Sequence, residues 1–298
     1  MNLIKTFWEL PPKTVARKAK HRILRRSGRE PDLDDLLESP KHMRPQRFYD
    51  FLSRYEAILA RSTGWAPLEF ENRNVLEIGC GPLMGWGPLA VFLGCRRYLG
   101  IEPQFDRRIL EDEVFVRRYF LPMFKDLTAI YGHRYDFDQF LEALETQTDL
   151  TGKHLVDLDG DSTFDVVLSN SCLEHVTPFE ESIARLKEVS APGSRFLHLV
   201  DFGNHRPTPS PFSDLYEVKP DRYFATYGQH INLLRPPDIV EAFCRNGFDA
   251  HLEPYYAAHE GYDGDISAYW LEHYRREDLF LKTGLVHGEV ALTQIDSG

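Results

Sequence analysis

A glycine-rich turn, EIGCG at residues 77–81, restricts the fold of this 298-residue chain more than any other feature. The run NVLEIG (74–79) that leads into it has the length and composition of a buried strand, and PLAVFLG (88–94) after it resembles an apolar helix. Glycine in such a turn lets the backbone reverse tightly and approach a ligand closely. A strand, a glycine turn and a helix in this order predict a βαβ unit and hence a parallel sheet.

Strand-like and helical segments continue to alternate after this turn. The expected further strands are RRYLGIEP (96–103), HLVD (154–157), FDVVLSN (164–170), SRFLHLVDF (194–202) and two closing strands within 248–259 and 284–295. Helical patterns lie between them, and RPPDIVEAFCRNGF (235–248) has proline and Asp238 in its first turn. The sequence therefore predicts an α/β domain over residues 36–298 with helices on both faces of the sheet. Two inserts are expected, at about 105–150 and at 203–235, the second as an active-site segment.

Charge separates the first residues from the rest of the chain. Residues 1–30 hold nine Lys and Arg against two Glu, a net charge of +7, while the whole chain carries −11. The remaining body is strongly acidic, which argues against nucleic-acid binding because phosphate contact needs a basic surface. Residues 1–35 are predicted to form a basic amphipathic helical arm and a linker. Such a helix fits docking on the anionic inner face of a membrane, or packing on its own acidic body.

The expected location is the cytoplasm. The four cysteines are scattered without metal-binding spacing, so neither a zinc site nor a disulfide framework is indicated. No run reaches the roughly 18–20 apolar residues of a membrane span, and the first residues do not read as a signal peptide. The oligomeric state is not encoded in any recognisable pattern.

Acidic residues accompany the glycine turn. Glu77 stands two residues before Gly79, and a carboxylate there would repel a pyrophosphate but suits a ligand that is cationic at that end. The dinucleotide pattern is also incomplete, because its third glycine is replaced by Met84. Glu102 ends the second strand, about 21 residues after Gly81, where an acid usually holds ribose hydroxyls.

Four motifs resemble those of class I S-adenosylmethionine (SAM)-dependent methyltransferases, of the kind called type 11 or type 23. They are EIGCG (77–81), YLGIEP (98–103), FDVVLSNSCLEHV (164–176) and APGSRFLHLVDF (191–202), and the resemblance extends over about residues 65–295. It implies a Rossmann-like fold with a seven-stranded mixed sheet, SAM as the cofactor, and methyl transfer as the activity. The cofactor residues that it implies are Glu77, Gly79, Cys80, Gly81, Glu102, Pro103, Asn170 and Ser171, with Asp157 on the adenine side.

The segment HLVDFGNH (198–205) supplies the candidate catalytic residues. Strand alternation places His198 and Asp201 on opposite faces, and Gly203 allows a turn that brings His205 over the pocket. An imidazole held by a carboxylate is a good base for a hydroxyl near neutral pH. The alternatives are that His198 is a core histidine and Asp201 a loop cap, or that Asp201, His205 and His198 bind a metal ion, which two imidazoles would make a transition metal.

Other polar and aromatic residues are candidates for acceptor contacts. His175 lies just past the fourth expected strand, where it shapes the pocket, and the insert adds Tyr223, Tyr227, His230 and Arg235. Aromatic rings stack on sugars, and arginine binds carboxylate or phosphate. The segment 198–235 also resembles a subset of methyltransferases that modify sugars and small molecules.

The sequence thus predicts a SAM-dependent O-methyltransferase that acts on a hydroxyl of a saccharide, glycan or similar polar small molecule, as in polysaccharide biosynthesis. Two alternatives stay open at this point. One is an N- or carboxyl-methyltransferase, in which the histidines only position the acceptor. The other is a non-catalytic methyltransferase-like scaffold subunit, which the complete set of Glu77, Gly79, Gly81 and Glu102 argues against.

Overall fold

The computed structural model describes residues 36–38, 43–103, 107–160, 163–206, 208–257, 262 and 264–291. The predicted basic arm and linker (1–35) lie outside these residues, so they stay predictions. The described chain divides into two compact units, a smaller one with residues 36–38, 43–46 and 107–126 and a larger one that holds the rest from residue 47 on. The division therefore falls inside the predicted domain, at residue 46 and within the first predicted insert.

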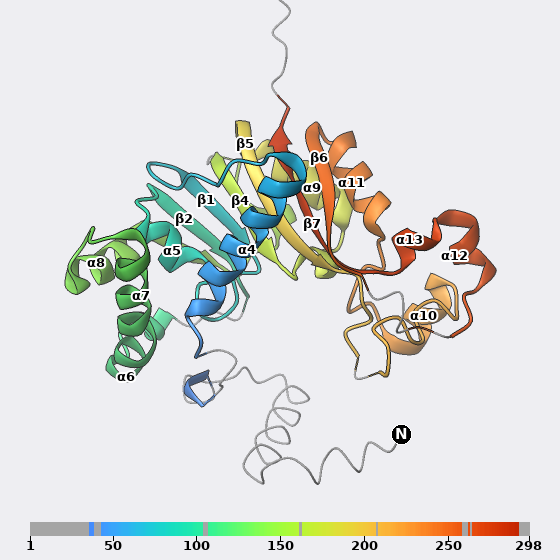
Figure 1. The fold of residues 1–298 in the computed structure, drawn as a ribbon, viewed down its shortest axis with the longest axis horizontal. Coiled ribbons are helices and arrows are strands. Elements are labelled where there is room, and N and C mark those ends of the chain that lie inside the picture. Colours follow the sequence, from blue (N-terminus) through green and yellow to red (C-terminus); the bar gives the residue numbers. More distant parts are fainter. Residues whose placement is uncertain are drawn as a thin grey trace, which may run out of the picture. The chain divides into compact units, whose positions relative to one another are not determined.

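A mixed sheet forms the centre of the larger unit. Within the described residues its order is β3-β2-β1-β4-β5-β7-β6. The strands are β1 (Asn74–Ile78), β2 (Arg97–Ile101), β3 (Thr148–Thr151), β4 (Phe164–Asn170), β5 (Ser190–Asp201), β6 (Phe248–Ala257) and β7 (Leu281–Val290). The first five are parallel, and β7 runs antiparallel between β5 and β6. The predicted seven-stranded α/β sheet is confirmed (Figure 1).

The third strand lies elsewhere than predicted. HLVD (154–157) is not a strand, because Leu155–Asp157 forms a short 3-10 turn, η3. The strand is instead Thr148–Thr151, which pairs in parallel with Tyr98–Ile101 of β2. This segment follows its preceding helix directly and is only partly buried, so its apolar pattern is weak.

Helices cover both faces of this sheet. On one face α9 (Phe179–Glu188) and α11 (Pro236–Arg245) pack against Leu76 and Ile78 of β1 in one apolar core. The alternate β1 side chain Glu77 contacts Trp86 on the other face, where α4 (Gln46–Thr63) and α5 (Gly87–Phe92) lie. Figure 1 shows α4 crossing the sheet on the side opposite α9 and α11. Because side chains alternate along β1, Leu76 and Ile78 face α9 and α11, whereas Glu77 faces the layer of α4 and α5.

The first predicted insert is helical, as expected. Within the smaller unit it forms η1 (Arg107–Leu110), α6 (Glu113–Phe115) and a π-helical segment, η2 (Val116–Phe120). It continues through α7 (Leu121–Tyr131), and α8 (Phe137–Gln147) follows. The Asp112 carboxylate caps α6 by accepting a hydrogen bond from the Phe115 amide at 2.8 Å, which satisfies one of the amides left over at a helix start.

The second predicted insert is a packed lobe and not an open loop. Residues 212–234 and 262–280 share an aromatic core and are called the aromatic lobe here; it contains α10 (Pro220–Tyr227), α12 (Ala268–His273) and α13 (Arg276–Leu279). Its fully buried members include Tyr216, Tyr223 and Trp270. The aromatic residues that gave the insert little periodicity are therefore mainly core residues.

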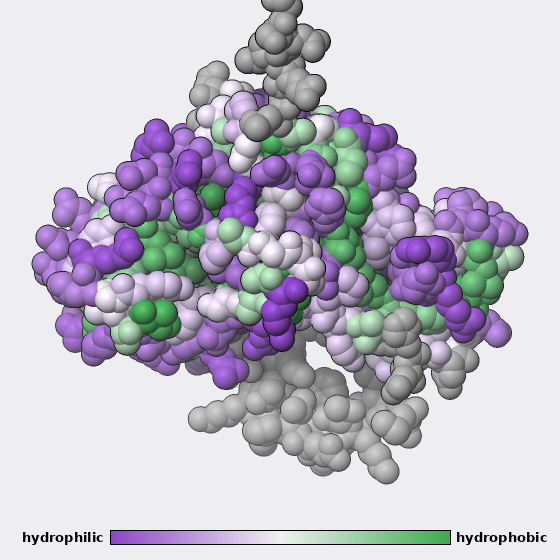
Figure 2. All heavy atoms as spheres, turned by 45° about the horizontal axis from the view of Figure 1, so that its top comes forward, coloured by the Kyte–Doolittle hydropathy of each residue, from purple (hydrophilic) through white to green (hydrophobic). Residues whose placement is uncertain are grey.

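The surface agrees with the acidic, strongly charged composition. Hydrophilic side chains cover most of the described surface seen in Figure 2, with apolar patches between them. Among the described helices, none combines the length and apolar character that crossing a membrane requires.

Candidate active site

The glycine turn is fixed to the carboxyl end of β2. The backbone amides of Gly79 and Cys80 donate to the Ile101 carbonyl at 2.9 and 3.3 Å, and the Gly81 amide donates to Oε2 of Glu102 at 2.9 Å. Both glycines have positive φ, 70° and 71°, a conformation that favours glycine. The predicted partners of one cofactor, the turn and Glu102, are therefore brought together.

The two glycines serve different purposes. A methyl group at Gly79 would lie 2.4 Å from Sγ of Cys172, so this position packs the turn against the segment after β4. A methyl at Gly81 would meet no atom within 4 Å. Open space beside Gly81 and Glu102 is what a bound nucleoside requires at this edge of the sheet.

Glu77 points into the turn but is nearly fully buried, with 1% exposed. Its Oε2 accepts hydrogen bonds from the Trp86 amide and the Tyr98 hydroxyl, both at 2.7 Å. Burial raises the pKa of Glu77 to about 8. Glu77 thus organises the loop between β1 and α5, and its predicted contact with the cofactor stays a prediction.

Gly85 gives this loop its close approach to Glu77. A methyl group at Gly85 would lie 2.0 Å from Oε1 of Glu77, and φ is 47°. Gly85 therefore leaves room for the Glu77 carboxylate, next to the Met84 position where the dinucleotide pattern would have its third glycine.

The remaining predicted cofactor residues differ in their surroundings. Oδ1 of Asn170 accepts a hydrogen bond from the Tyr55 hydroxyl at 2.8 Å, and Ser171 follows with a positive φ of 53°. The Cys80 thiol is buried, which raises its pKa. Pro103 and Asp157 are exposed, the latter on η3 after β3.

A cluster of titratable groups occupies the carboxyl ends of β4 and β5. Nε2 of His205 lies 3.5 Å from Oδ2 of Asp201 and 3.6 Å from Oε1 of Glu174. Asp201 also accepts hydrogen bonds from Nζ of Lys282 on β7 and from the Gly203 amide. We call Asp201, Glu174, His205 and His175 the acid–histidine cluster. It brings together the predicted pair Asp201 and His205.

The electrostatics of this cluster distinguish its two acids. The interaction with His205 and the hydrogen bonds from Lys282 and the Gly203 amide hold the pKa of Asp201 down at about 2, against the opposing effect of burial. Burial instead raises the pKa of Glu174 to about 8. The Asp201 side chain raises the pKa of His205, although burial opposes it. Asp201 is thus held as an anion beside His205, whereas burial favours the neutral form of Glu174.

Glu174 was not among the residues predicted from the sequence. It lies on the 3-10 turn η4 (Leu173–His175) directly after β4, with 4% exposed. Among the residues that the structure describes, neither of its carboxylate oxygens has a hydrogen-bond partner of normal geometry. The only sequence signal was its place beside His175 in SCLEHV.

His175 belongs to the same cluster. Its ring centroid lies 4.9 Å from that of His205, and Nδ1 is 2.6 Å from the His230 carbonyl oxygen. Nε2 of His230 in turn lies 3.4 Å from the Asn204 carbonyl oxygen. The structure therefore places the two predicted acceptor histidines beside Asp201 and His205.

His198 lies away from the cluster, in the core. It is fully buried, its Nδ1 is 2.8 Å from the Ser169 hydroxyl, and its ring packs against Phe196 and Phe243. Burial lowers its pKa to about 3, so the imidazole is neutral. The expectation that His198 is catalytic or a metal ligand does not fit this position, because β-strand pleating turns it to the face opposite Asp201.

Two of the predicted acceptor residues are also core residues. Tyr223 is fully buried, and Arg235 is 1% exposed with Nη1 donating to the Phe202 carbonyl and to the Tyr216 hydroxyl. Tyr227 is partly exposed beneath the guanidinium of Arg206, which lies 3.7 Å from the ring centroid. Because both side chains are buried, the structure does not support direct contact of Arg235 or Tyr223 with the acceptor.

Comparison with known proteins identifies the family. A family model described as "Methyltransferase domain" matches residues 41–253, well over half of the chain. The chain belongs to this methyltransferase family. It is an enzyme of the class I SAM-dependent type, and SAM is its cofactor. No curated protein sequence matches it significantly.

Solved structures similar to this methyltransferase share low sequence identity with it. A SAM-dependent methyltransferase from Mesorhizobium loti is 15% identical with a TM-score of 0.45, covering 80% of this chain and 97% of its own. A putative SAM-dependent methyltransferase from Listeria monocytogenes is 17% identical with a TM-score of 0.43, with 78% and 98% covered. Magnesium protoporphyrin IX methyltransferase from Synechocystis PCC 6803 with bound SAH is 12% identical with a TM-score of 0.42, with 94% and 99% covered.

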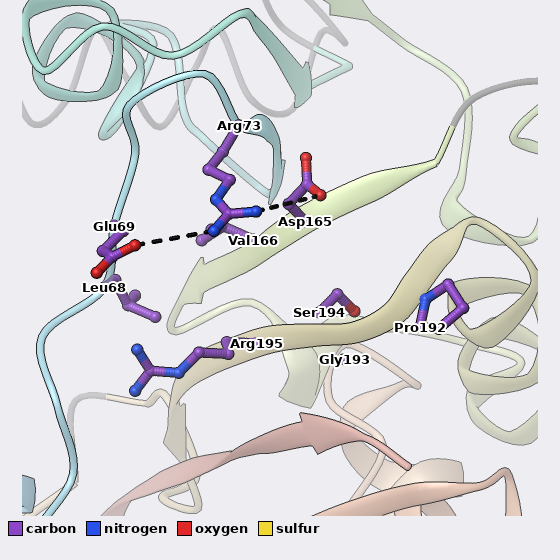
Figure 3. A pocket seen from close by; sticks show the side chains of 9 residues that line it. All are labelled: Leu68, Glu69, Arg73, Asp165, Val166, Pro192, Gly193, Ser194 and Arg195. Atoms are coloured by element: carbon purple, nitrogen blue, oxygen red, sulfur yellow. Dashed lines mark ion pairs between the residues drawn. The ribbon is translucent and has the colours of Figure 1, made fainter. Parts of the chain in front are cut away.

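One pocket of the methyltransferase lies at the opposite edge of the sheet. Arg73 is placed there between Glu69 and Asp165, at 3.8 and 4.0 Å, as Figure 3 shows. The pocket is small, about 120 Å³, and Asp165 lies at the start of β4, directly after Phe164, whereas the acid–histidine cluster follows the end of this strand. Ligands of open α/β sheets bind at the carboxyl ends of the strands, so this pocket is not the active site.

Proposed function

We propose that this methyltransferase transfers a methyl group to a hydroxyl of a saccharide, glycan or similar polar small molecule. The observation that carries the proposal is the convergence of Asp201, Glu174 and Nε2 of His205 at the carboxyl ends of β4 and β5. The open space beside Gly81 and Glu102 lies at the carboxyl ends of β1 and β2, and β1 is the direct neighbour of β4.

The chemistry of a hydroxyl acceptor explains why such a cluster is needed. Bound SAM supplies an electrophilic methyl on a sulfonium, so an O–C bond forms while the S–C bond breaks and its electron pair stays on sulfur. A hydroxyl must also lose its proton, which calls for a base or an activating cation. An amine or carboxylate is already nucleophilic and needs positioning only.

The residues of the cluster suit this task. Asp201 is anchored by Lys282 and the Gly203 amide, so its charge stays fixed beside His205. That charge raises the pKa of His205 and makes the imidazole a stronger base or ligand. The buried Glu174 carboxyl lies close to the same residue, with Oε1 3.6 Å from Nε2 of His205.

The acceptor class is supported by the partly open rim of the cluster. His175 and His230 are exposed and offer polar contacts, while Tyr227 offers a partly exposed aromatic ring. Sugar rings are bound by such combinations of aromatic faces and hydrogen-bonding groups. Methylation of a small-molecule amine or carboxyl group is the second candidate. Its one support is that His175 and His230 are exposed and could position such an acceptor without taking a proton from it.

The proposed location is the cytoplasm, at the inner face of a membrane, reached through the basic arm. The support is the +7 charge of residues 1–30, which suits anionic lipid. Flotation with anionic vesicles tests this point: recovery should fall when residues 1–30 are removed, and equal recovery would exclude the role.

Methyl transfer from labelled SAM into a host cell extract tests the activity. Asp201→Asn and His205→Ala should each bind SAM normally and lower turnover by about 10²–10⁴-fold, the usual contribution of acid–base catalysis. A matched control is the exposed pair His251 and Asp249 on β6, 3.2 Å apart, whose Ala and Asn variants should keep full turnover. Full turnover by both cluster variants would contradict hydroxyl activation by these residues.

A further inference from the structure

We propose that Glu174, His175 and His205 form a binding site for a divalent transition-metal ion of the Zn²⁺ class. The inference deepens the proposed function, because the ion would hold and activate the acceptor hydroxyl. Metal binding itself does not depend on which acceptor is methylated.

The spacing of the three side chains fits a single ion. One ligand atom from each of them lies within 4.8 Å of the others. Two ligand atoms bound about 2.1 Å from a tetrahedral ion lie about 3.4 Å apart. The separation of 3.6 Å between Nε2 of His205 and Oε1 of Glu174 is close to this value and long for a direct hydrogen bond.

Glu174 provides an independent indication that a ligand belongs here. Its carboxyl group is 4% exposed, and both oxygens lack a hydrogen-bond partner of normal geometry. A buried carboxylate without close hydrogen-bond partners is strongly unfavourable unless a proton or a cation neutralises it. A bound metal ion would satisfy both oxygens and the charge together.

His175 is already oriented as metal-binding histidines usually are. Its Nδ1 lies 2.6 Å from the backbone carbonyl of His230, so the ring proton belongs on Nδ1. That leaves the Nε2 lone pair for a ligand. A backbone carbonyl that fixes the tautomer in this way is typical of imidazole ligands.

The charges around the site define its selectivity. Asp201 lies 3.5 Å from Nε2 of His205, but Lys282 and the Gly203 amide already occupy it, so it acts as an outer anion. Two imidazoles with one carboxylate favour zinc and its neighbours over magnesium, which prefers oxygen ligands. The net negative charge of both acids, reduced by Lys282, still favours a dication.

Three protein ligands leave a fourth position for the acceptor oxygen. An ion there lowers the pKa of the hydroxyl, and its proton passes to solvent at the exposed side of His205 as the O–C bond forms. The number of ligands thus agrees with a catalytic site and not with a closed structural one.

Titration of the chelator-treated full chain with Zn²⁺, and separately with Co²⁺, tests the site. We expect one equivalent of Zn²⁺ to bind and to raise the melting temperature, and bound Co²⁺ to show the visible absorption of tetrahedral coordination. Mg²⁺ should bind far more weakly. Native mass spectrometry of the unmodified protein gives the stoichiometry without any variant.

The variants Glu174→Gln and His175→Gln should each weaken Zn²⁺ binding by about 100-fold or more, since even outer partners of metal ligands contribute 10–100-fold. His273→Gln is the matched control, because Nδ1 of His273 also lies near a backbone carbonyl, that of Tyr269 at 2.7 Å, on exposed α12. It should bind Zn²⁺ as the unmodified protein does.

Less than one equivalent of bound metal, or Zn²⁺ affinity in the two cluster variants equal to that of the unmodified protein, would overturn the metal site. Methyl transfer that survives chelation and still requires His205 would leave the proposed function intact, with the proton taken by the imidazole. Bound metal without methylation of any hydroxyl would instead contradict the proposed function alone.

Discussion

At the scale of single residues, neighbours decide what each position tolerates. The sequence predicted that Gly79 and Gly81 form a tight turn, and their positive φ angles agree. It did not predict the need for glycine at position 85. That need arises from the Glu77 carboxylate, which lies close to Gly85 only once the loop has folded over β1. Glu174 was missed for the same reason: its burial depends on the loop that follows β5.

Gly85→Ala should destabilise the methyltransferase by about 2–4 kcal/mol, because left-handed backbone strain and overlap with Oε1 of Glu77 add together. Gly132→Ala is the control, since Gly132 also has positive φ, 86°, but a methyl there meets no atom within 4 Å. It should cost about 1–2 kcal/mol from strain alone. Urea unfolding measures both, and equal losses would show that contact with Glu77 is unimportant.

Acid should destabilise the fold through His198. The pKa of this buried imidazole is lowered to about 3, whereas an unfolded histidine titrates near 6.5. The unfolded chain therefore binds more protons between these values, and stability falls as pH falls from 6.5 towards 3. Replacement by Gln, which retains a polar partner for Ser169, should reduce the slope of stability against pH by up to about 1.4 kcal/mol per unit. An unchanged slope between pH 6 and 4 would contradict the assignment.

At the scale of elements, periodicity predicted most strands and helices but not their partners. The pleat of β5 was predicted correctly, with His198 and Asp201 on opposite faces. The third strand was misplaced because Thr148–Thr151 has no apolar run and is defined by pairing with β2. The aromatic lobe lacked periodicity because its short helices pack around rings from distant segments.

Arg235 connects this lobe to the strand that carries Asp201. Its Nη1 donates to the Phe202 carbonyl at 2.8 Å and to the Tyr216 hydroxyl at 2.9 Å. Arg235→Met should cost about 2–4 kcal/mol, because buried acceptors lose a charged donor, and should expose the aromatic lobe to proteolysis. Arg222→Met on the exposed side of α10 should cost under about 0.5 kcal/mol. Equal protease resistance in the two variants would exclude this connection.

At the scale of the whole molecule, the carboxyl edge of the sheet in the larger unit carries two separate sets of functional candidates, each at the ends of its own pair of strands. The ends of β1 and β2 carry the glycine turn and Glu102, while the ends of β4 and β5 carry Glu174, His205 and Asp201. The family and the cofactor follow from the first set, which local sequence motifs encode. The proposed acceptor chemistry rests on the second set, whose members come together only in the folded chain.

The linkage of the transferred methyl group tests the central proposal most directly. After incubation of labelled SAM and the methyltransferase with a host extract, the product is treated with alkali and then with hydriodic acid. Hydroxyl methylation predicts a label that resists alkali and is released as methyl iodide, as expected of an ether. Volatile methanol released by alkali would identify a carboxyl ester, and a label that resists hydriodic acid under the conditions that cleave ethers would identify a methyl group bound to nitrogen or carbon; either result would contradict hydroxyl methylation.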